Sequence, residues 1–268
     1  MNDFLAKRPN ESTETGPRLA IVAGLYRERL PTPTLNGHVS RVWINELAQP
    51  SELQIIPDGC MDIIWTGERL QVAGPDTHAV IERMPGATLV GIRFAPGAAP
   101  LWLRASAATL VNSRVPLEHF WGGAATDRLA DRLSAEQSPS AVARILEHAL
   151  VERLPNVDAP DSLVSAVVRA VTRAATNGTA VVRRLVDELG GSERTLRRRC
   201  DEAFGYGPKM LARILRFQKF LRLVHHSDQP WLSMLAIEAG YADQAHLTRE
   251  SRRLVGFTPR RVVSELRS

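Results

Sequence analysis

Three arginines in the C-terminal third of the chain have the spacing of one helix face. Arg194 precedes Arg197 by three residues and Arg198 by four, so a helix would place the three side chains together. The planar guanidinium fork matches guanine O6 and N7, and it also matches phosphate oxygens. The group indicates contact with a nucleic acid. A solvated, arginine-rich helix surface is the plainer interpretation of these residues taken alone.

A second stretch offers the same chemistry further along the chain, in "AGYADQAHLTRESRRLVGFTPRR" (residues 239–261). Asp243 is a suitable capping residue for a helix that begins there. One face of this helix would carry side chains that can donate or accept hydrogen bonds at base edges. These candidates are Gln244, Thr248 and Arg249, with His246 near the edge of that face. Leu247 is expected to point inward as the core anchor.

The two stretches belong to a repeated layout, "VVRRLVDELGGSERTLRRRCDEAFGYGPK" (residues 181–209) and "SMLAIEAGYADQAHLTRESRRLVGFTPR" (residues 233–260). Each copy has an apolar helix, a glycine turn, a capping residue (Ser192 or Asp243), a second helix and a closing Gly-aromatic-x-Pro. This is the helix-turn-helix layout, whose second helix enters the major groove with its N-terminal half. In the first copy, Leu196 and Cys200 would point inward.

One long helix is predicted between the copies, from Met210 to Ser227, because its apolar residues recur at helical spacing. Such a connector would hold two reading helices roughly 34 Å apart, which is about one turn of DNA. The charge distribution agrees with a polyanionic partner. From Thr176 onward there are 17 Arg and Lys against 10 Asp and Glu, whereas the first 175 residues hold 17 against 19.

The front of the chain has a different pattern of residues. Short apolar runs at residues 35–44, 52–65 and 87–97, broken by glycine and proline, predict strands of a sandwich or small barrel. The turn signal "PDG" at residues 57–59 predicts a hairpin within the second run. Helical spacing then dominates residues 124–154, with Ser138-Pro139-Ser140 separating two helices, and residues 162–178 predict a further helix ending at Asn177-Gly178.

The sequence therefore predicts an α+β protein with a β-rich front domain and an all-α tandem helix-turn-helix domain. We expect a disordered lead-in over residues 1–18, a sensor-like or dimerisation domain over 19–120, a helical linker region over 121–178 and the DNA-binding domain over 179–268. The chain has no apolar run long enough to cross a membrane, and its polar start does not resemble a secretory signal. Only two cysteines are present, which favours a reducing cytoplasm over a disulfide framework or a zinc finger.

Another group of reactive side chains lies at Asp58, Cys60 and Asp62. Strand alternation would place Cys60 and Asp62 on one face, so a metal or ligand site is one interpretation. The alternative is a structural turn in which an Asp side chain bonds the backbone. No histidine neighbours the group, and nothing in the chain assembles a nucleophile, a base and an orienting acid. We expect no catalytic residue, no metal and no cofactor.

Four of the five tryptophans have two interpretations. Trp43, Trp65, Trp102 and Trp121 would either line a pocket of the front domain or fill its core. Trp231 precedes the first helix of the second copy and is expected to pack there.

The repeated unit and its connector "LRFQKFLRLV" closely resemble the AraC/XylS class of bacterial transcription regulators, over about a third of the chain. Two residues depart from that pattern: Cys200 stands where the class usually has phenylalanine, and Arg199 where an apolar residue is common. The front, marked by "PDGCMDIIW", "GIRFAPGAAPLWL" and "VPLEHFWG", resembles a cupin-like sensor domain seen with such DNA-binding domains.

The resemblance implies a cytoplasmic, sequence-specific DNA-binding regulator and not an enzyme. Its implied partners are double-stranded promoter or operator DNA, RNA polymerase, a small-molecule effector and a second copy of the chain, with no membrane partner. One alternative is an enzyme built on the front domain that uses the DNA part for targeting, including a repair protein with Cys60 as methyl acceptor. Another is a regulator without an effector, whose front domain serves only as an interface.

Overall fold

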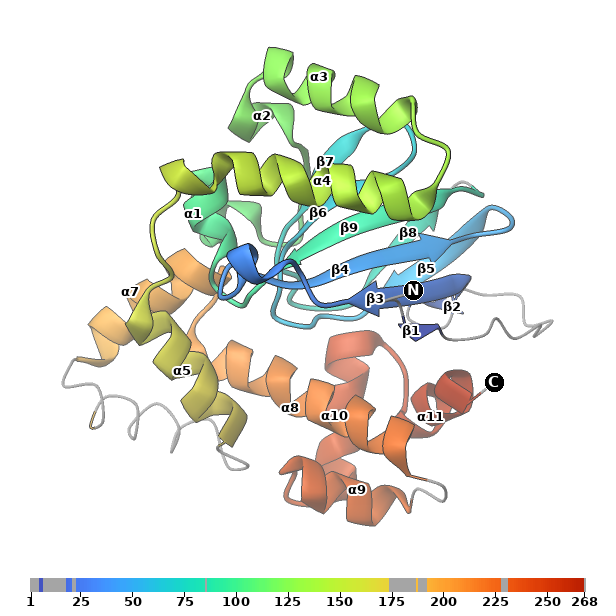
Figure 1. Cartoon of the computed structure of the whole chain (residues 1–268). Coiled ribbons are helices and arrows are strands. Elements are labelled where there is room, and N and C mark those ends of the chain that lie inside the picture. The colour runs from blue at the N-terminus through green and yellow to red at the C-terminus, as the bar shows by residue number, and fades with distance from the viewer. Residues whose placement is uncertain are drawn as a thin grey trace.

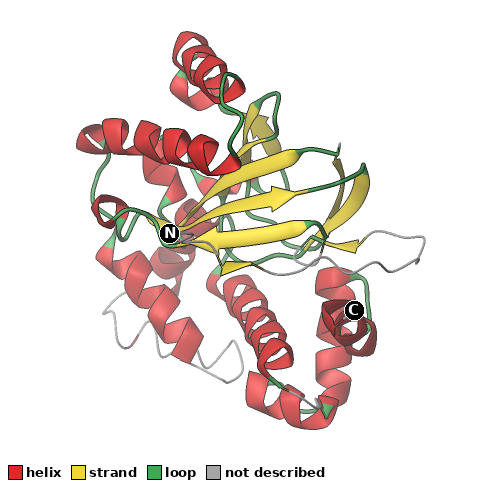
Figure 2. Cartoon of the chain, turned by 45° about the vertical axis from the view of Figure 1, so that its right-hand side comes forward, coloured by secondary structure: helices red, strands yellow, loops and turns green. Residues whose placement is uncertain are grey.

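The computed structural model has a β-rich front part and a helical C-terminal part that pack against each other (Figures 1 and 2). The structure describes residues 5–6, 18–20, 23–84, 86–173, 187, 192–227 and 231–267. The fold class is α+β, as predicted. No helix among these residues is long and apolar enough to span a membrane.

Two sheets form the front part. The larger has seven antiparallel strands in the order β1 (Leu5–Ala6), β3 (Leu25–Arg29), β4 (Val39–Glu46), β9 (Thr88–Phe94), β6 (Asp62–Trp65), β7 (Leu70–Ala73) and β10 (Arg114–Pro116). The smaller has the order β2 (Arg18–Leu19), β5 (Ser51–Ile55) and β8 (Val80–Met84), with β2 and β5 parallel. β1 falls within the expected lead-in, most of which lies outside the described residues.

Strand β4 is buried on both faces, and this divides the front part into layers. Val42 and Ile44 belong to the cluster that includes residues of helices α3 and α4, whereas Trp43 belongs to the cluster shared with the smaller sheet. Successive side chains of a strand point to opposite faces, which explains this division. Gly91 of β9 is paired with Trp43, and a Cβ there would lie 2.1 Å from the indole ring. A larger residue at position 91 would displace that tryptophan.

The predicted strand at 87–97 is present as β9, but the predicted hairpin around residues 57–59 is wrong. β5 and β6 lie in different sheets, so this turn carries the chain from one sheet to the other. Gly59 has φ +83°, and the Asp58 Oδ1 accepts a hydrogen bond from the Cys60 N–H at 2.9 Å. The turn itself was therefore predicted correctly. It does not determine whether the next strand pairs back or crosses to another sheet.

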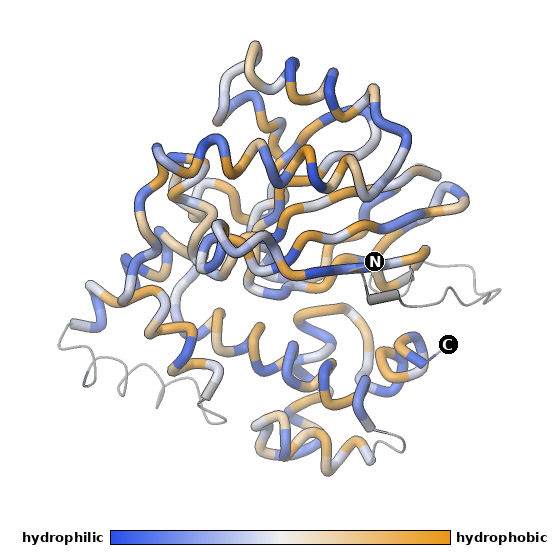
Figure 3. The backbone as a smooth tube through the Cα atoms, in the orientation of Figure 1, coloured by the Kyte–Doolittle hydropathy of each residue, from blue (hydrophilic) through white to orange (hydrophobic). Residues whose placement is uncertain are grey.

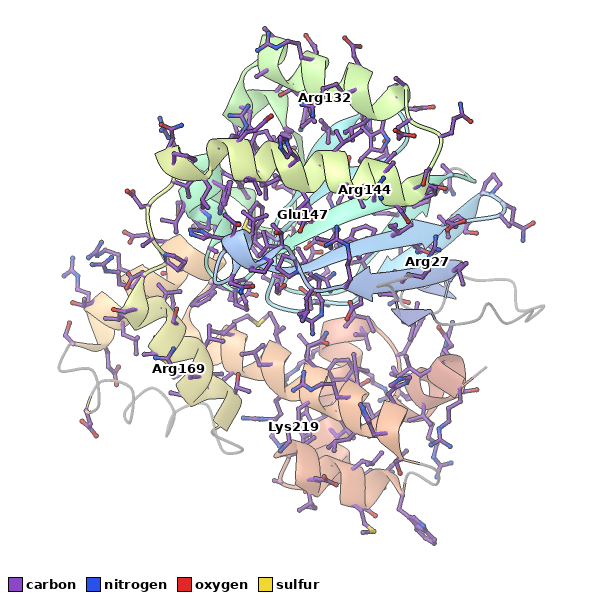
Figure 4. The ribbon with its side chains drawn as sticks, viewed as in Figure 1. Arg27, Arg132, Arg144, Glu147, Arg169 and Lys219 are labelled. Atoms are coloured by element: carbon purple, nitrogen blue, oxygen red, sulfur yellow. The ribbon has the colours of Figure 1, made fainter. Side chains whose placement is uncertain are left out.

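Helices cover the outer face of the larger sheet. The front part contains η1 (Pro33–Leu35), α1 (Ala99–Leu103), η2 (Ala107–Leu110), α2 (Glu118–Trp121), α3 (Gly123–Ser134), α4 (Pro139–Arg153) and η3 (Leu154–Asn156). The two helices predicted over 124–154 are confirmed, and Ser138 caps α4 through its Oγ, which accepts from the Ala141 N–H. Glu147 of α4 is turned toward the strands (Figure 4) and pairs with Arg29 at 2.7 Å.

Six described helices make up the C-terminal part: α5 (Ser162–Arg173), α7 (Glu193–Phe204), α8 (Pro208–His226), α9 (Leu232–Ala239), α10 (Gln244–Val255) and α11 (Pro259–Arg267). Hydrophobic and hydrophilic residues alternate along these helices (Figure 3). α5 lies within the expected linker region, yet its Val164 and Val167 share one core with Leu196 of α7 and Leu211 of α8. The first helix of the first copy, and the predicted helix end at Asn177-Gly178, lie outside the described residues except for Asp187.

Trp231 does not pack as expected. Its exposed fraction is 71%, and Met234 and Ile237 on the same side of α9 are also exposed. The residue precedes α9 as its N-cap, with a backbone that is extended and not helical. Proximity to an apolar helix in sequence therefore did not bring this indole into the core.

Candidate DNA-binding site

Helices α9 and α10 form a helix-turn-helix with a tight, capped turn. α9 ends at Gly240, whose φ of +97° is a conformation that glycine adopts without a Cβ penalty. The turn then leads to Asp243, whose Oδ1 accepts from the His246 N–H at 2.6 Å. This confirms Asp243 as the N-cap of α10. The cap fixes where the helix begins, and so where its first exposed side chains lie.

The inner face of α10 anchors it to the connector helix α8. Leu247 is fully buried, as predicted for the core anchor. Glu250 is also buried and pairs with Arg213 of α8 at 2.7 Å, and Arg253 lies 3.4 Å from its other oxygen. Sequence reasoning missed this carboxylate. One sequence feature could have predicted it: an acidic residue three positions after Leu247, on the inward side of an otherwise basic helix.

The outer face of α10 presents most of the predicted contacts. Gln244 and Arg249 are exposed, and the Thr248 hydroxyl donates to the Gln244 carbonyl at 2.9 Å. His246 also holds the turn, because its Nδ1 accepts from the Ala242 N–H at 3.3 Å and its ring meets Tyr241 edge-on. Nε2 is the ring nitrogen that remains available for a contact with DNA.

Helix α7 is the corresponding helix of the first copy. Its N-cap is Ser192, whose Oγ accepts from the Thr195 N–H at 3.1 Å, as predicted. Leu196 and Cys200 are buried in the C-terminal core, which confirms their predicted inward direction. Burial raises the pKa of the Cys200 thiol to about 12, with Asp201 adding to the shift. This cysteine is a small apolar filler at pH 7.

The three arginines of α7 lie together on its exposed surface. Arg197 is 3.7 Å from Asp201, and Arg198 is 2.8 Å from Glu202, both one helical turn further on. Such exposed pairs contribute roughly 0–1 kcal/mol, so a phosphate can displace them at little cost. Arg194 has no ion-pair partner among the described residues. Arg199 instead points toward Asp161 before α5, at 3.3 Å, which accounts for a charged residue at a position that is commonly apolar in the resembled class.

The connector helix separates the two candidate helices. α8 has 19 residues, which corresponds to about 28 Å at 1.5 Å per residue. In Figure 1, α7 lies beside the start of α8, while α9, α10 and α11 gather about its second half. The predicted connector over 210–227 is thus confirmed as one continuous helix ending at His226.

Two family models match the chain. Residues 185–264 match a helix-turn-helix domain family, and this match includes α7, α8, α9 and α10. The C-terminal part is an AraC-type helix-turn-helix domain, and the chain is a DNA-binding transcription regulator with an N-terminal domain. Residues 27–116 match a family described as a domain of unknown function, DUF6597, which covers most strands of the front part.

Solved structures of ToxT from Vibrio cholerae are similar to the regulator in fold. One has 9% sequence identity and a TM-score of 0.46, covering 84% of this chain and 96% of that chain. An apo ToxT variant has 11% identity and a TM-score of 0.48, covering 89% and 100%. A third contains ToxT bound to (E)-4-(8-methylnaphthalen-1-yl)but-3-enoic acid, with 10% identity, a TM-score of 0.45 and coverage of 84% and 97%. No curated protein matches the regulator.

The front part supplies hydrogen bonds to the end of α10. The last carbonyls of a helix have no partner within it. Here the Gln54 Nε2 donates to the Val255 carbonyl, and the Ala79 N–H donates to the Leu254 carbonyl, both at 2.6 Å. A third bond joins the Gln218 Nε2 of α8 to the Pro57 carbonyl at 2.7 Å. Sequence reasoning missed this interface, because its polar atoms come from distant parts of the chain.

Asp58, Cys60 and Asp62 are brought together, but around an arginine. Arg93 of β9 lies 3.2 Å from both carboxylates, and the Trp43 Nε1 donates to Asp62 at 3.0 Å. Burial raises the pKa of the Asp62 carboxyl, while Arg93 opposes that shift; burial also raises the pKa of the Cys60 thiol. The turn interpretation is confirmed for Asp58. Over the part of the chain that the structure describes, no group of three His, Cys, Asp or Glu residues could hold a metal ion.

The other tryptophans divide between the two interpretations. Trp43 lines a cavity between the sheets. Trp65 and Trp102 are buried in the core beneath the helices, and the Trp121 Nε1 donates to the Trp102 carbonyl at 3.2 Å.

Proposed function

We propose that the regulator recognises its operator by placing α7 and α10 in two successive major grooves on one side of the duplex. The observation that carries this proposal is the pair of capped helices at separate positions along α8, each with an exposed polar N-terminal half. Helices mounted this way present side chains to base edges without remodelling their own core. The basic C-terminal third supplies the attraction to phosphates.

Seven residues would make base or nearby phosphate contacts: Arg194, Arg197, Arg198, Gln244, His246, Thr248 and Arg249. Arg249 and Gln244 are the leading base readers, since both are exposed and Arg249 has no ion-pair partner in the described part of the chain. Arg197 and Arg198 each already pair with a carboxylate on the helix surface. We assign them to phosphates, because a phosphate can replace such a weak ion pair. His246 contributes chiefly by shaping the turn.

The front part would modulate this binding. Its described residues donate hydrogen bonds to the last two carbonyls of α10 and to none of the side chains that would read bases. A shift of the front part therefore changes the support of a recognition helix without touching DNA. Promoter DNA as the partner implies action in the cytoplasm, with RNA polymerase, a second copy of the chain and a small effector as further partners. The proposal assigns no catalytic role.

The decisive experiment titrates the purified regulator against its own upstream intergenic DNA, at several salt concentrations and against scrambled competitor. Preference for that DNA with a steep salt dependence is expected. Arg249→Ala should weaken specific binding by about 10- to 100-fold, which corresponds to roughly 1–3 kcal/mol for a lost bidentate base contact.

A matched control is Arg128→Ala, which removes an exposed arginine of α3 in the front part and should change neither specific nor non-specific binding. Equal loss of specific and non-specific affinity in Arg249→Ala would refute base reading by that residue. Absence of any binding at low salt would refute the proposal as a whole.

A further inference from the structure

A cavity of about 200 Å³ lies between the two sheets of the front part. Trp43, Ile64 and Leu89 of the larger sheet form one wall, and Leu53 and Met84 of the smaller sheet form another. Gln218 and Leu221 of the connector helix α8 also line it. A largely apolar cavity with a few polar groups is the usual form of a small-molecule site.

The charges in this cavity are unsuited to an anion. Both arginines that line it are already paired: Arg93 with Asp58 and Asp62, and Arg114 with Asp76 at 2.8 Å and with Glu82. The three aspartates named here also line the cavity, so carboxylates outnumber guanidinium groups there. Among the described lining residues, an anionic ligand would find no free cation and a surplus of negative charge. A cationic group would balance that surplus.

Two buried acceptors in the lining lack partners. Asn45 is 3% exposed and Gln54 is 5% exposed, and the side-chain carbonyl oxygen of each has no hydrogen-bond partner among the described residues. They come from different sheets, β4 and β5, and both line the cavity. A buried acceptor left unpaired destabilises the fold, so a ligand that donates hydrogen bonds would remove that penalty.

An aromatic wall completes the site. The rings of Tyr26 and Trp43 stack at 6.2 Å between centroids, and both residues line the cavity. The face of an aromatic ring attracts a cation, most strongly for tryptophan. Charge balance, unpaired acceptors and aromatic surface are separate properties, and all three favour the same ligand chemistry.

We propose that this cavity binds a small, largely apolar organic amine, whose ammonium group donates to the carbonyl oxygens of Asn45 and Gln54. Gln54 would then have two partners: its Oε1 would accept from the ligand, while its Nε2 donates to the Val255 carbonyl at the end of α10. The ligand would contact the side chain that supports the second recognition helix. That regulatory consequence rests on the proposed function, whereas binding itself can be measured without DNA.

The test uses the full chain without DNA and three probes of matched shape: phenethylamine, 2-phenylethanol and 3-phenylpropionate. Saturation-transfer NMR titrations give the affinity of each probe, and thermal unfolding gives an independent measure, since a ligand of the folded state raises its apparent stability. Phenethylamine should bind saturably at millimolar or lower concentration and more tightly than the alcohol, and 3-phenylpropionate should bind weakest.

Two variants locate the binding. Asn45→Leu and Gln54→Leu each remove one acceptor at similar volume and should weaken phenethylamine by about tenfold or more, as expected for a hydrogen bond to a charged group. Gln71→Leu is the matched control, because Gln71 is a buried glutamine of β7 that does not line the cavity. It should leave the affinity unchanged.

Asn45→Leu keeps the test valid if loss of the Gln54 bond to α10 disturbs folding. The proposal is overturned if 3-phenylpropionate binds as tightly as phenethylamine, if no probe binds saturably, or if Asn45→Leu binds the amine unchanged. None of these results bears on operator recognition, so failure here is distinguishable from failure of the proposed function.

Discussion

Gly205 and Gly256 occupy equivalent positions in the two copies, and they offer a measurement of how firmly the front part is docked. Each ends a proposed recognition helix in the left-handed conformation, with φ of +81° and +72°. Alanine pays roughly 1–2 kcal/mol for this conformation. If backbone strain were the whole effect, Gly205→Ala and Gly256→Ala would destabilise the regulator equally.

Their surroundings differ. A Cβ at Gly256 would have nothing within 4 Å, whereas one at Gly205 would lie 2.8 Å from Pro75 and Val111 and 2.9 Å from the Ala107 carbonyl. Those neighbours belong to the front part, and overpacking of this kind typically adds about 1–3 kcal/mol. We therefore expect a loss of roughly 1–2 kcal/mol for Gly256→Ala and roughly 2–5 kcal/mol for Gly205→Ala.

Urea denaturation of the full chain tests this comparison, with the midpoint and the slope recorded for each variant. A separate early transition in Gly205→Ala would report undocking of the front part before global unfolding. Equal losses in the two variants, with unchanged slopes, would refute the inference that Gly205 sits in a tight interface between the two parts.

Two further predictions concern the recognition helices. Asp243→Ala should lower the free energy of unfolding by about 1 kcal/mol and Asp243→Asn by much less, because asparagine keeps the capping acceptor; equal losses in urea denaturation would mean that the charge, and not the hydrogen bond, provides the stabilisation. Cys200 should react slowly with iodoacetamide at pH 8.5 until urea unfolds the chain, since its folded pKa of about 12 exceeds the ordinary value of 9.0. Its contribution to stability is present below about pH 9 and is lost as the pH rises toward 12, so Cys200→Ala should reduce the loss of stability over that interval.

Features set by a few neighbouring residues could be predicted from the sequence. The caps Ser192 and Asp243 and the buried Leu247 follow from side-chain chemistry and helical spacing within one turn or two. The connector helix follows from a long apolar repeat without a breaker.

Features that depend on distant partners could not be predicted. The turn at residues 57–59 was recognisable, but pairing of the following strand with β7 and β9 depends on residues that come later in the chain. Glu250 finds Arg213 across two helices, and Gln54 finds Val255 about two hundred residues away. Trp231 shows the converse case, since a large apolar side chain remained exposed because nothing in the fold covers it among the described residues.

The position of α5 bears on how such regulators can be recombined. Val164, Val167, Ala170 and Val171 are buried in the same core as α7 and α8, although α5 follows the front part in sequence. Consider a chimera that joins residues 179–268 to the front part of another protein. It would lack α5, and the core that α5 shares with α7 and α8 would be exposed. A junction in the loop between α4 and α5, over residues 157–161, would keep α5 with α7 and α8, and Leu19 of β2 is then the buried member of this core that the front part still has to supply. The place for exchanging modules therefore lies well ahead of the repeat that reads DNA.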